Sequence, residues 1–327
     1  MAAPVELTSL ARAGGCAAKY SAARPDEQVG CVRRDEPPDE LLEAGGGVLR
    51  GTATRARERS QLHRGCHAPS VRPQRGGTRG PPTSSSFGQS TVDLWEDPDM
   101  PSALVTGGSS GIGLAIARML REEGFGLTLA ARNVERLEVA AAELEAASFA
   151  VDVRDEGACA QLVASHLEHH GGIDVLVNCA GVGIAGRIGE TPTKQFDLQQ
   201  TVNLRGAFLV TREALPALRE SRGYVVNLAS IAGTIPTPGL ASYGAAKAAL
   251  IALTRSLDRE EVGSGVRATA LCPGFVDTPM AEWTGIPGQE MIQPEDCAEI
   301  VRALLHLSPY ARVPVVVIER AGGEGVG

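Results

Sequence analysis

The stretch Ala103-Leu-Val-Thr-Gly-Gly-Ser-Ser-Gly-Ile-Gly113 decides how the folded part of this 327-residue chain is organised. A short apolar segment runs into a glycine-rich turn, and the helix-forming sequence 114–124 follows it. Gly107 permits a tight turn, Gly111 lets the backbone approach a pyrophosphate, and Gly113 lets helix and strand pack closely. The N–H groups at the start of the helix then favour phosphate binding. The spacing Gly-x-x-x-Gly-x-Gly departs from the common Gly-x-Gly-x-x-Gly fingerprint, so this motif needs support from other parts of the chain.

Strand-forming and helix-forming segments alternate after this motif. Strands are expected at 126–131, 149–153 and 173–178, and helices at 134–147 and 157–169. Alternation of this kind is typical of a parallel, doubly wound α/β sheet. The apolar character of the strands agrees with burial on both faces of such a sheet.

The end of the second strand bears on the choice of cofactor. An acid at this place would bind the ribose 2′-OH of NAD, but Ala131 stands there and Arg132 follows it. A guanidinium group suits a 2′-phosphate, so the sequence favours NADP over NAD. The alternative is that Arg132 is an ordinary surface arginine.

A second motif, Ala241-Ser-Tyr-Gly-Ala-Ala-Lys247, opens another helix-forming stretch. Tyr243 and Lys247 stand four residues apart, so both side chains lie on one helix face. A phenol has a free pKa of about 10, and a nearby ammonium favours the phenolate and lowers that pKa. Such a pair can exchange a proton with a substrate oxygen. Ser230 ends the preceding apolar run and offers a hydroxyl to the same oxygen.

The composition strengthens this interpretation. The chain has 31 lysines and arginines together, but the lysines are only Lys19, Lys194 and Lys247. A chain that otherwise uses arginine has a lysine where a compact ammonium is useful. The alternative is a packed tyrosine beside a solvated lysine.

Charge and cysteine content narrow the class of protein. The net charge is −8, and residues 101–327 carry all of it, with 18 basic and 26 acidic side chains. An acidic folded part argues against nucleic acid as the main partner. The seven cysteines form no Cys-x-x-Cys pair, which indicates reduced thiols in a cytoplasmic protein. No apolar run reaches the ~20 residues of a membrane span, and no secretory signal is recognisable.

Residues 1–99 differ from the rest of the chain. They are rich in Gly, Ala, Arg, Pro and Ser without a sustained period, so a disordered, low-complexity extension is expected. Residues 51–80 carry seven arginines and one acid. A basic tail that binds nucleic acid is therefore the alternative to a disordered extension without such a role. A mitochondrial transit peptide fits less well because of the acids between positions 26 and 40. A further hypothesis is that the natural protein starts at Met100, with 100–327 as its single folded domain.

Three histidines end the helix expected at 157–169. Helical spacing makes a metal pair of His166 and His170 conceivable. The interaction of a histidine with the C-terminal end of a helix dipole explains them without a metal. We therefore expect no metal site.

Together the motifs are specific. The chain resembles the short-chain dehydrogenase/reductase family over about residues 101–320, and the resemblance implies a single doubly wound Rossmann-type domain with a parallel seven-stranded sheet. Six pieces carry it in order: Thr106-Gly-Gly-Ser-Ser-Gly-Ile-Gly113, Asp152-Val153, Asn178-Cys-Ala-Gly181, Asn203, Ser230 with Tyr243-x-x-x-Lys247, and Pro273-Gly-Phe-Val-Asp-Thr278.

The resemblance implies roles for the catalytic residues. Tyr243 would be the acid/base, and Lys247 would lower its pKa and hold the nicotinamide ribose. Ser230 would orient the substrate carbonyl oxygen, and Asn203 would anchor a water in a proton relay that reaches Lys247.

The resemblance also implies a cofactor site. Asp152 would contact the adenine, and Asn178 would steady the neighbouring strand and the adenine pocket. With Arg132, the full set of expected cofactor-binding residues is Gly107, Ser109, Ser110, Gly111, Ile112, Gly113, Arg132, Asp152, Val153, Asn178, Ala180, Gly181, Tyr243, Lys247, Pro273, Gly274, Val276 and Thr278.

The implied function is an NAD(P)-dependent oxidoreductase that interconverts a ketone or aldehyde and an alcohol. The alternative is a catalytically silent NADP-sensing protein on the same fold. Sensors commonly lose the Tyr or the Lys, and here both are present, which favours the enzyme. A third reading is a basic tail that tethers the enzyme to RNA or an acidic surface. Family members are usually homodimers or homotetramers.

The chain departs from the family pattern near its end. The lid segment 280–293 is short. A short lid predicts an open pocket and disfavours a pocket formed around a bulky, steroid-type substrate. Residues 311–320 lack the common Thr-Gly…Asp-Gly-Gly close, and in this they resemble members that act on small alcohols and β-hydroxy acids. Trp283 is expected either to line the pocket or to pack the lid on the body.

Overall fold

The computed structural model describes residues 100–322. The predicted disordered extension over residues 1–99 lies outside the described residues. Within the described part, no helix combines the length and the apolar character that a membrane crossing requires.

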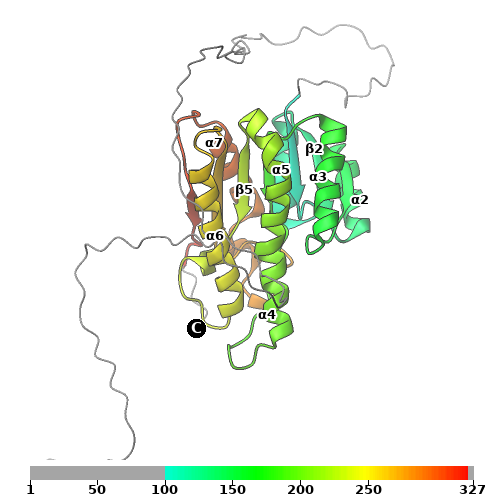
Figure 1. Ribbon diagram of the computed structural model, residues 1–327. Helices are drawn as coiled ribbons and strands as arrows, with labels where there is room; N and C mark the ends of the chain where they lie inside the picture. The colour runs from blue at the N-terminus through cyan, green and yellow to red at the C-terminus, as the bar shows by residue number, and fades with distance from the viewer. Residues whose placement is uncertain (1–99, 323–327) are drawn as a thin grey trace, which may run out of the picture. The chain divides into compact units, whose positions relative to one another are not determined.

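The described part alternates strands and helices along the chain (Figure 1). The strands are β1 (Ser102–Thr106), β2 (Gly126–Ala131), β3 (Ala147–Ala150), β4 (Val175–Asn178), β5 (Tyr224–Leu228), β6 (Arg267–Pro273) and β7 (Val315–Ile318). The α-helices are α1 (Gly111–Glu122), α2 (Val134–Leu144), α3 (Glu156–His170), α4 (Thr193–Gln200), α5 (Ala207–Ser221), α6 (Ala241–Glu260) and α7 (Pro294–Leu305). A π-helix, η1 (Thr201–Gly206), joins α4 to α5, and short 3₁₀ turns form η2 (Ile231–Gly233), η3 (Glu282–Thr284) and η4 (Gly288–Glu290).

The seven strands form one parallel sheet in the order β3-β2-β1-β4-β5-β6-β7. The chain winds outward from β1 to β3, then returns to place β4 on the other side of β1. A crevice opens at the carboxyl ends of the strands where the winding reverses, and ligands bind at such points. The predicted doubly wound, seven-stranded parallel sheet is therefore confirmed.

Helices cover both faces of the sheet, with α3, α5 and α6 on the face toward the viewer in Figure 1. Side chains alternate along each strand, so Leu104 of β1 joins the core under these three helices. Ala103 and Val105 join the opposite core, which α1, α2 and α7 cover. Strands buried on both faces are mostly apolar, and the one asparagine in each of β4 and β5, Asn178 and Asn227, is hydrogen-bonded to the other.

The third strand is shifted from its predicted position. A strand was expected at 149–153, but β3 ends at Ala150, and Asp152 accepts a hydrogen bond from the Arg154 amide (3.0 Å) that turns the chain. The preceding helix also ends early, because Glu145 adopts a left-handed conformation (φ 47°) and closes α2. Ala147 is then free to pair with Thr128 of β2.

The histidines at the end of α3 have different environments. His166 is fully buried, and its Nδ1 lies 2.8 Å from the hydroxyl of Thr128 while its Nε2 lies 3.1 Å from the carbonyl oxygen of Gly172. Burial, with a smaller contribution from neighbouring His170, lowers the pKa of His166 to about 3. The expected dipole interaction requires a charged ring. That explanation is wrong for His166, which is a neutral part of the hydrogen-bonded core.

Candidate active site

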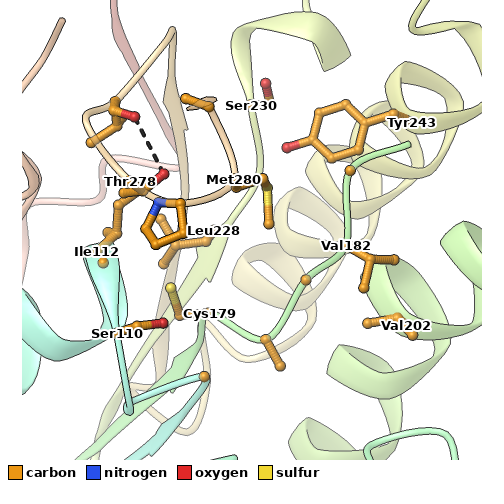
Figure 2. A pocket seen from close by; sticks show the side chains of 18 of the residues that line it. Ser110, Ile112, Cys179, Val182, Val202, Leu228, Ser230, Tyr243, Thr278 and Met280 are labelled. Atoms are coloured by element: carbon orange, nitrogen blue, oxygen red, sulfur yellow. Dashed lines mark hydrogen bonds between the residues drawn. The ribbon is translucent and has the colours of Figure 1, made fainter. Parts of the chain in front are cut away.

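A cavity of about 980 Å³ lies at the carboxyl ends of the strands. Its walls come from the loop after β1, the ends of β2 and β5, the loop after β4, the first turns of α6 and the segment after β6. Figure 2 shows this cavity, with Ser230 and Tyr243 on one side and Ser110 and Ile112 on the other. The crevice predicted by the winding of the sheet is thus lined by residues that are far apart in the sequence.

Glycine is required at three points of the loop after β1. Gly107 has a φ of 69°, and a Cβ on it would lie 2.7 Å from the backbone nitrogen of Ala180. Gly111 has a φ of 52°, and its Cβ would lie 2.9 Å from the methyl carbon of Thr278. A Cβ on Gly113 would overlap the carbonyl oxygen of Gly107. Side chains here would push the loop away from the strands. Gly113 itself does not line the cavity.

The start of α1 faces the cavity. The residue before the helix, Ser110, is extended (φ −169°), and the first helical hydrogen bond runs from the Leu114 amide to the Ser110 carbonyl. The amides of the first turn therefore have no partner within the helix, and they lie at the positive end of its dipole. Gly111 and Ile112 of this turn line the cavity together with the side chains of Ser109 and Ser110. This arrangement suits phosphate oxygens.

Two arginines line the cavity beyond β2. Arg132 is exposed directly after the strand. Asn133 caps α2 by accepting the amide of Arg136 on its side-chain oxygen (2.8 Å), and this holds Arg136 in the first helical turn. Sequence reasoning identified Arg132 and missed Arg136. Arg132 precedes the cap of α2 and is not part of the helix, so helical spacing from Arg132 does not predict the direction of Arg136.

The carboxylate of Asp152 lines the same end of the cavity. The carboxylate accepts a hydrogen bond from Nε of Arg154 (2.8 Å). This hydrogen bond is the main reason that the pKa of Asp152 lies below its usual range. The charge of Arg132 contributes in the same direction. Val153, also expected in the cofactor site, is buried and lines the cavity.

Asn178 and Asn203 lie behind the cavity wall rather than in it. Asn178 ends β4, and its amide nitrogen donates to the side-chain oxygen of Asn227 (2.8 Å) on neighbouring β5. Asn203 sits in η1 and bonds both backbone groups of Val182, accepting its N–H and donating to its carbonyl oxygen (each 2.8 Å). A Cβ on Gly181 would lie 3.1 Å from the Asn203 oxygen, so this loop passes close to η1. Asn178 thus ties the end of β4 to β5, and Asn203 fixes the loop after β4, of which Ala180 and Gly181 line the cavity.

Tyr243, Lys247 and Ser230 meet at one end of the cavity. Tyr243 is in the first turn of α6, and Figure 2 shows its hydroxyl pointing toward the part of the cavity beside Ser230. Lys247 follows one turn later, is 5 % exposed, and donates its Nζ proton to the carbonyl oxygen of Leu228. Ser230 is buried, and its hydroxyl oxygen accepts the Ala232 amide (3.2 Å) at the start of η2.

Burial dominates the acid–base properties of this group. It raises the pKa of Tyr243 to about 12, against an opposing effect of the Ser230 hydroxyl. It lowers the pKa of Lys247 to about 8. The sequence predicted that Lys247 lowers the pKa of Tyr243. The pKa of Tyr243 is raised overall because removal of the phenolate from water outweighs the hydrogen bond with Ser230, and the predicted effect of Lys247 on this pKa stays a prediction.

The segment after β6 closes the cavity from the other side. Pro273, Gly274, Val276 and Thr278 all line it, as expected. The Thr278 hydroxyl donates to the carbonyl oxygen of Val276 (3.3 Å), marked by the dashed line in Figure 2. The chain then continues into the short lid.

The lid contributes apolar side chains. Trp283 lines the cavity and also packs edge-on against Phe275, with ring centroids 6.2 Å apart. Both alternatives for Trp283 therefore hold. Met280 lines the cavity beside Tyr243, which the sequence did not indicate. Met280 lies in a short irregular segment, and without a helical or strand period the sequence does not predict where its side chain points.

Cys179 also lines the cavity, between the glycine loop and Lys247. Burial raises the pKa of its thiol to about 12. The side chain is therefore a protonated thiol at neutral pH and a poor nucleophile.

Comparison with known proteins agrees with this geometry. The family model described as "short chain dehydrogenase" matches residues 101–285. An uncharacterised oxidoreductase of Staphylococcus epidermidis is 37 % identical over 219 residues, which is 66 % of this chain and 95 % of that protein. The 2-(R)-hydroxypropyl-CoM dehydrogenase of Xanthobacter autotrophicus is 42 % identical over 193 residues, 55 % of this chain and 76 % of that protein.

Solved structures with the same fold include proteins in complex with nicotinamide cofactors. An alcohol dehydrogenase from the archaeon Thermococcus sibiricus, complexed with 5-hydroxy-NADP, has a TM-score of 0.65 and 32 % identity, covering 68 % of this chain and 97 % of its own. A variant of actinorhodin polyketide ketoreductase with NADPH has a TM-score of 0.65 and 33 % identity, covering 71 % of this chain and 99 % of its own. Because the family model spans more than half of the sequence, the chain belongs to the short chain dehydrogenase family of oxidoreductases.

Proposed function

We propose that the protein is an NADP-dependent oxidoreductase that interconverts a ketone or aldehyde and the corresponding alcohol. One observation carries the proposal: Ser230, Tyr243 and Lys247 gather at one end of a continuous cavity, and the glycine loop and Arg132 lie at the other. A single cavity can therefore hold an extended dinucleotide with its reactive ring beside the phenol.

The residues of the cavity fit this cofactor. The first-turn amides of α1, with Ser109 and Ser110, suit the pyrophosphate. Arg132 at the end of β2 supports a 2′-phosphate, and no acid stands at Ala131 to bind a ribose 2′-OH. The two similar structures that contain 5-hydroxy-NADP and NADPH agree with this preference.

The chain's own residues supply the proton. When bound, NADPH supplies the hydride that reduces the carbonyl carbon, and the cofactor leaves as NADP⁺. Tyr243, protonated at neutral pH because burial raises its pKa to about 12, gives its proton to the carbonyl oxygen as the alcohol forms. Ser230 is placed to donate a hydrogen bond to the same oxygen and to fix the direction from which the substrate approaches. Alcohol oxidation follows the reverse path.

Lys247 and Asn203 support the tyrosine from behind. Lys247 lies between Tyr243 and the end of β5, where its ammonium favours the phenolate formed as the proton leaves. Asn203 holds the loop after β4 through both backbone groups of Val182. We propose that it positions this wall, and its expected role of anchoring a water in a proton relay to Lys247 stays a prediction.

The protein is also proposed to self-associate through α5 and α6. Phe208 of α5 is 44 % exposed, and the small side chains of Ala245 and Ala248 are exposed on α6. Small residues on an exposed helix face permit close helix packing. Light scattering of the purified full chain tests this, since a monomer would contradict it.

The activity is tested by cofactor oxidation with the purified full chain. NADPH and NADH are each supplied with a panel of ketones, aldehydes and β-keto esters. Turnover with NADPH supports the proposal. Tight NADPH binding without turnover of any panel member favours the alternative, a cofactor-sensing protein on the same fold.

A further inference from the structure

Charged side chains in the cavity are confined to its cofactor end, apart from one lysine. The charged residues among those that line the cavity are Arg132, Arg136, Asp152 and Lys247. The first three lie where β2 and β3 end. Among residues 100–322, therefore, no arginine that could pair with an acidic substrate lines the end that holds the Tyr243 hydroxyl.

Lys247 is poorly placed to bind a substrate anion. Its side chain is 5 % exposed, and its Nζ donates to the carbonyl oxygen of Leu228 inside the junction of α6 and β5. A Cβ on Gly181 would lie only 3.8 Å from this nitrogen, so the loop after β4 shields it as well. The ammonium serves the phenol from behind and does not reach across the substrate space.

Apart from the neutral residues Ser230 and Thr237, the side chains beside the Tyr243 hydroxyl are apolar. A Cβ on Gly183 would lie 3.4 Å from the sulfur of Met280 and 3.9 Å from Cε2 of Tyr243. Met280 and Tyr243 thus converge over Gly183 and bound one space, as Figure 2 shows for these two side chains. The apolar residues that complete the lining on this side include Val182, Ile184, Leu240, Phe275 and Trp283.

The lid adds negative charge near the cavity. Residues 274–293, which include the lid and the segment before it, contain Asp277, Glu282 and Glu290 and no lysine or arginine. Arg320 donates to the carbonyl oxygen of Glu290 (3.4 Å), so three acids stand against one arginine and the region remains negative. The loop 182–192, on the other side, contains one charge of each sign, Arg187 and Glu190, and neither lines the cavity. A field of this sign slows the approach of anions and leaves neutral molecules unaffected.

From these observations we infer that the substrate is a neutral ketone or aldehyde, or the matching alcohol, with an apolar substituent. Carboxylates, sulfonates and phosphates are excluded, because burying their charge against apolar walls without a cationic partner is unfavourable. The inference rests on the proposed function and decides a question that the sequence left open. Of the two substrate types that the C-terminal sequence resembles, small alcohols fit the cavity and β-hydroxy acids do not.

The first test compares three substrates that share the acetoacetyl group. The full chain is assayed with NADPH and ethyl acetoacetate, acetoacetamide or acetoacetate. Acetoacetamide and acetoacetate have nearly the same shape and differ in charge. We expect kcat/KM to be highest for the ester and at least about tenfold lower for acetoacetate than for the amide. Equal or faster turnover of acetoacetate would overturn the inference.

The second test measures binding without turnover. Cyclohexanecarboxamide and cyclohexanecarboxylate are titrated calorimetrically into the full chain with saturating NADP⁺. The neutral amide is expected to bind more tightly by about tenfold or more. Equal or tighter binding of the carboxylate would overturn the substrate class. If the amide binds preferentially but no carbonyl compound is reduced, the proposed reaction fails and the substrate class stands.

Two variants of Met280 test whether charge in the cavity wall selects the ligand. Met280→Arg is expected to raise the affinity for the carboxylate relative to the amide by about tenfold. Met280→Gln, which is polar but uncharged, is expected to leave that ratio unchanged. An unchanged ratio in Met280→Arg would show that charge at this wall does not select the ligand, and would contradict the inference.

Discussion

The ammonium nitrogen of Lys247 lies 5.6 Å from the centre of the Tyr243 ring, one helical turn further along α6. The same nitrogen donates to the carbonyl oxygen of Leu228, so one side chain ties the first turns of α6 to the end of β5. The phenol is held between a helix and a sheet edge, in surroundings where removal from water controls its ionisation. This relationship has a direct consequence for the pH dependence of catalysis.

Reduction and oxidation are expected to respond to pH in opposite ways. Reduction uses the protonated phenol, and burial raises the pKa of Tyr243 to about 12, so this form persists across the neutral range. Oxidation uses the phenolate, whose fraction rises about tenfold per pH unit below the pKa. We predict that kcat for alcohol oxidation rises from about pH 6 to 8, below the pKa of about 8 at which Lys247 loses its charge, while kcat for carbonyl reduction does not. An oxidation rate that levels off below about pH 7 would indicate a low tyrosine pKa and contradict the structure.

Arg132 is predicted to set the cofactor preference. Arg132→Ala removes a charge-assisted contact to the 2′-phosphate, which corresponds to about 1.5–3 kcal/mol, or a KM for NADPH about 10- to 100-fold higher. The KM for NADH is expected to change little. Arg118, which is exposed on α1 and paired with Glu143, provides the control variant Arg118→Ala. If both cofactors weaken equally in Arg132→Ala, the arginine does not read the 2′-phosphate.

A buried ion pair is predicted to stabilise the end of α6. Asp258 is 2 % exposed, lies 2.9 Å from Nη2 of Arg312, and accepts the Ala268 amide (3.1 Å). Arg312→Met leaves this carboxylate buried without its partner and is expected to lower the free energy of unfolding by about 3 kcal/mol. Adding Asp258→Asn keeps an acceptor for Ala268 and removes the charge, so the double variant should recover part of the loss. Urea unfolding measures both, and a double variant less stable than Arg312→Met would contradict this account.

His166 is predicted to make the fold sensitive to acid. Its folded-state pKa is lowered to about 3, while an unfolded histidine titrates at about 6.5. Between these values the unfolded chain binds the extra proton, so stability is fully present above pH ~6.5 and is lost as the pH falls toward ~3. The slope from this one group reaches about 1.4 kcal/mol per pH unit. Urea unfolding between about pH 7 and 5 should give a flatter dependence in His166→Gln. The exposed His169 provides the control variant His169→Gln, and equal slopes in wild type and His166→Gln would refute the assignment.

The fold was predictable to the extent that local sequence patterns control it. The strand, glycine turn and helix at 103–124 and the alternation after them led to the doubly wound sheet, because buried parallel strands need continuous apolar runs. The position of β3 was not predictable in this way. Its end depends on Asp152 bonding the backbone of Arg154, and the apolar pattern continues past that turn.

The candidate site was predictable where motifs dictate the residues. The glycine loop, Ser230 and Tyr243 all line the cavity, because each follows the carboxyl end of a strand or opens a helix next to one. Arg136 and Met280 were missed because their directions depend on a helix cap and on the packing of the lid. The effect of burial on the pKa of Tyr243 was not predictable, since spacing along a helix gives proximity to Lys247 but gives no measure of burial.

The exchange of Tyr243 for phenylalanine tests the central claim most directly. NADPH oxidation with ethyl acetoacetate is measured for the wild-type full chain and for the variant Tyr243→Phe. The control variant is Tyr310→Phe, because Tyr310 is 93 % exposed. NADPH affinity is measured separately by fluorescence. We predict that Tyr243→Phe loses about 10²- to 10⁴-fold in kcat, the usual contribution of a general acid, and still binds NADPH, while Tyr310→Phe matches wild type. Retention of wild-type kcat in Tyr243→Phe would show that the proton comes from another group and would contradict the account.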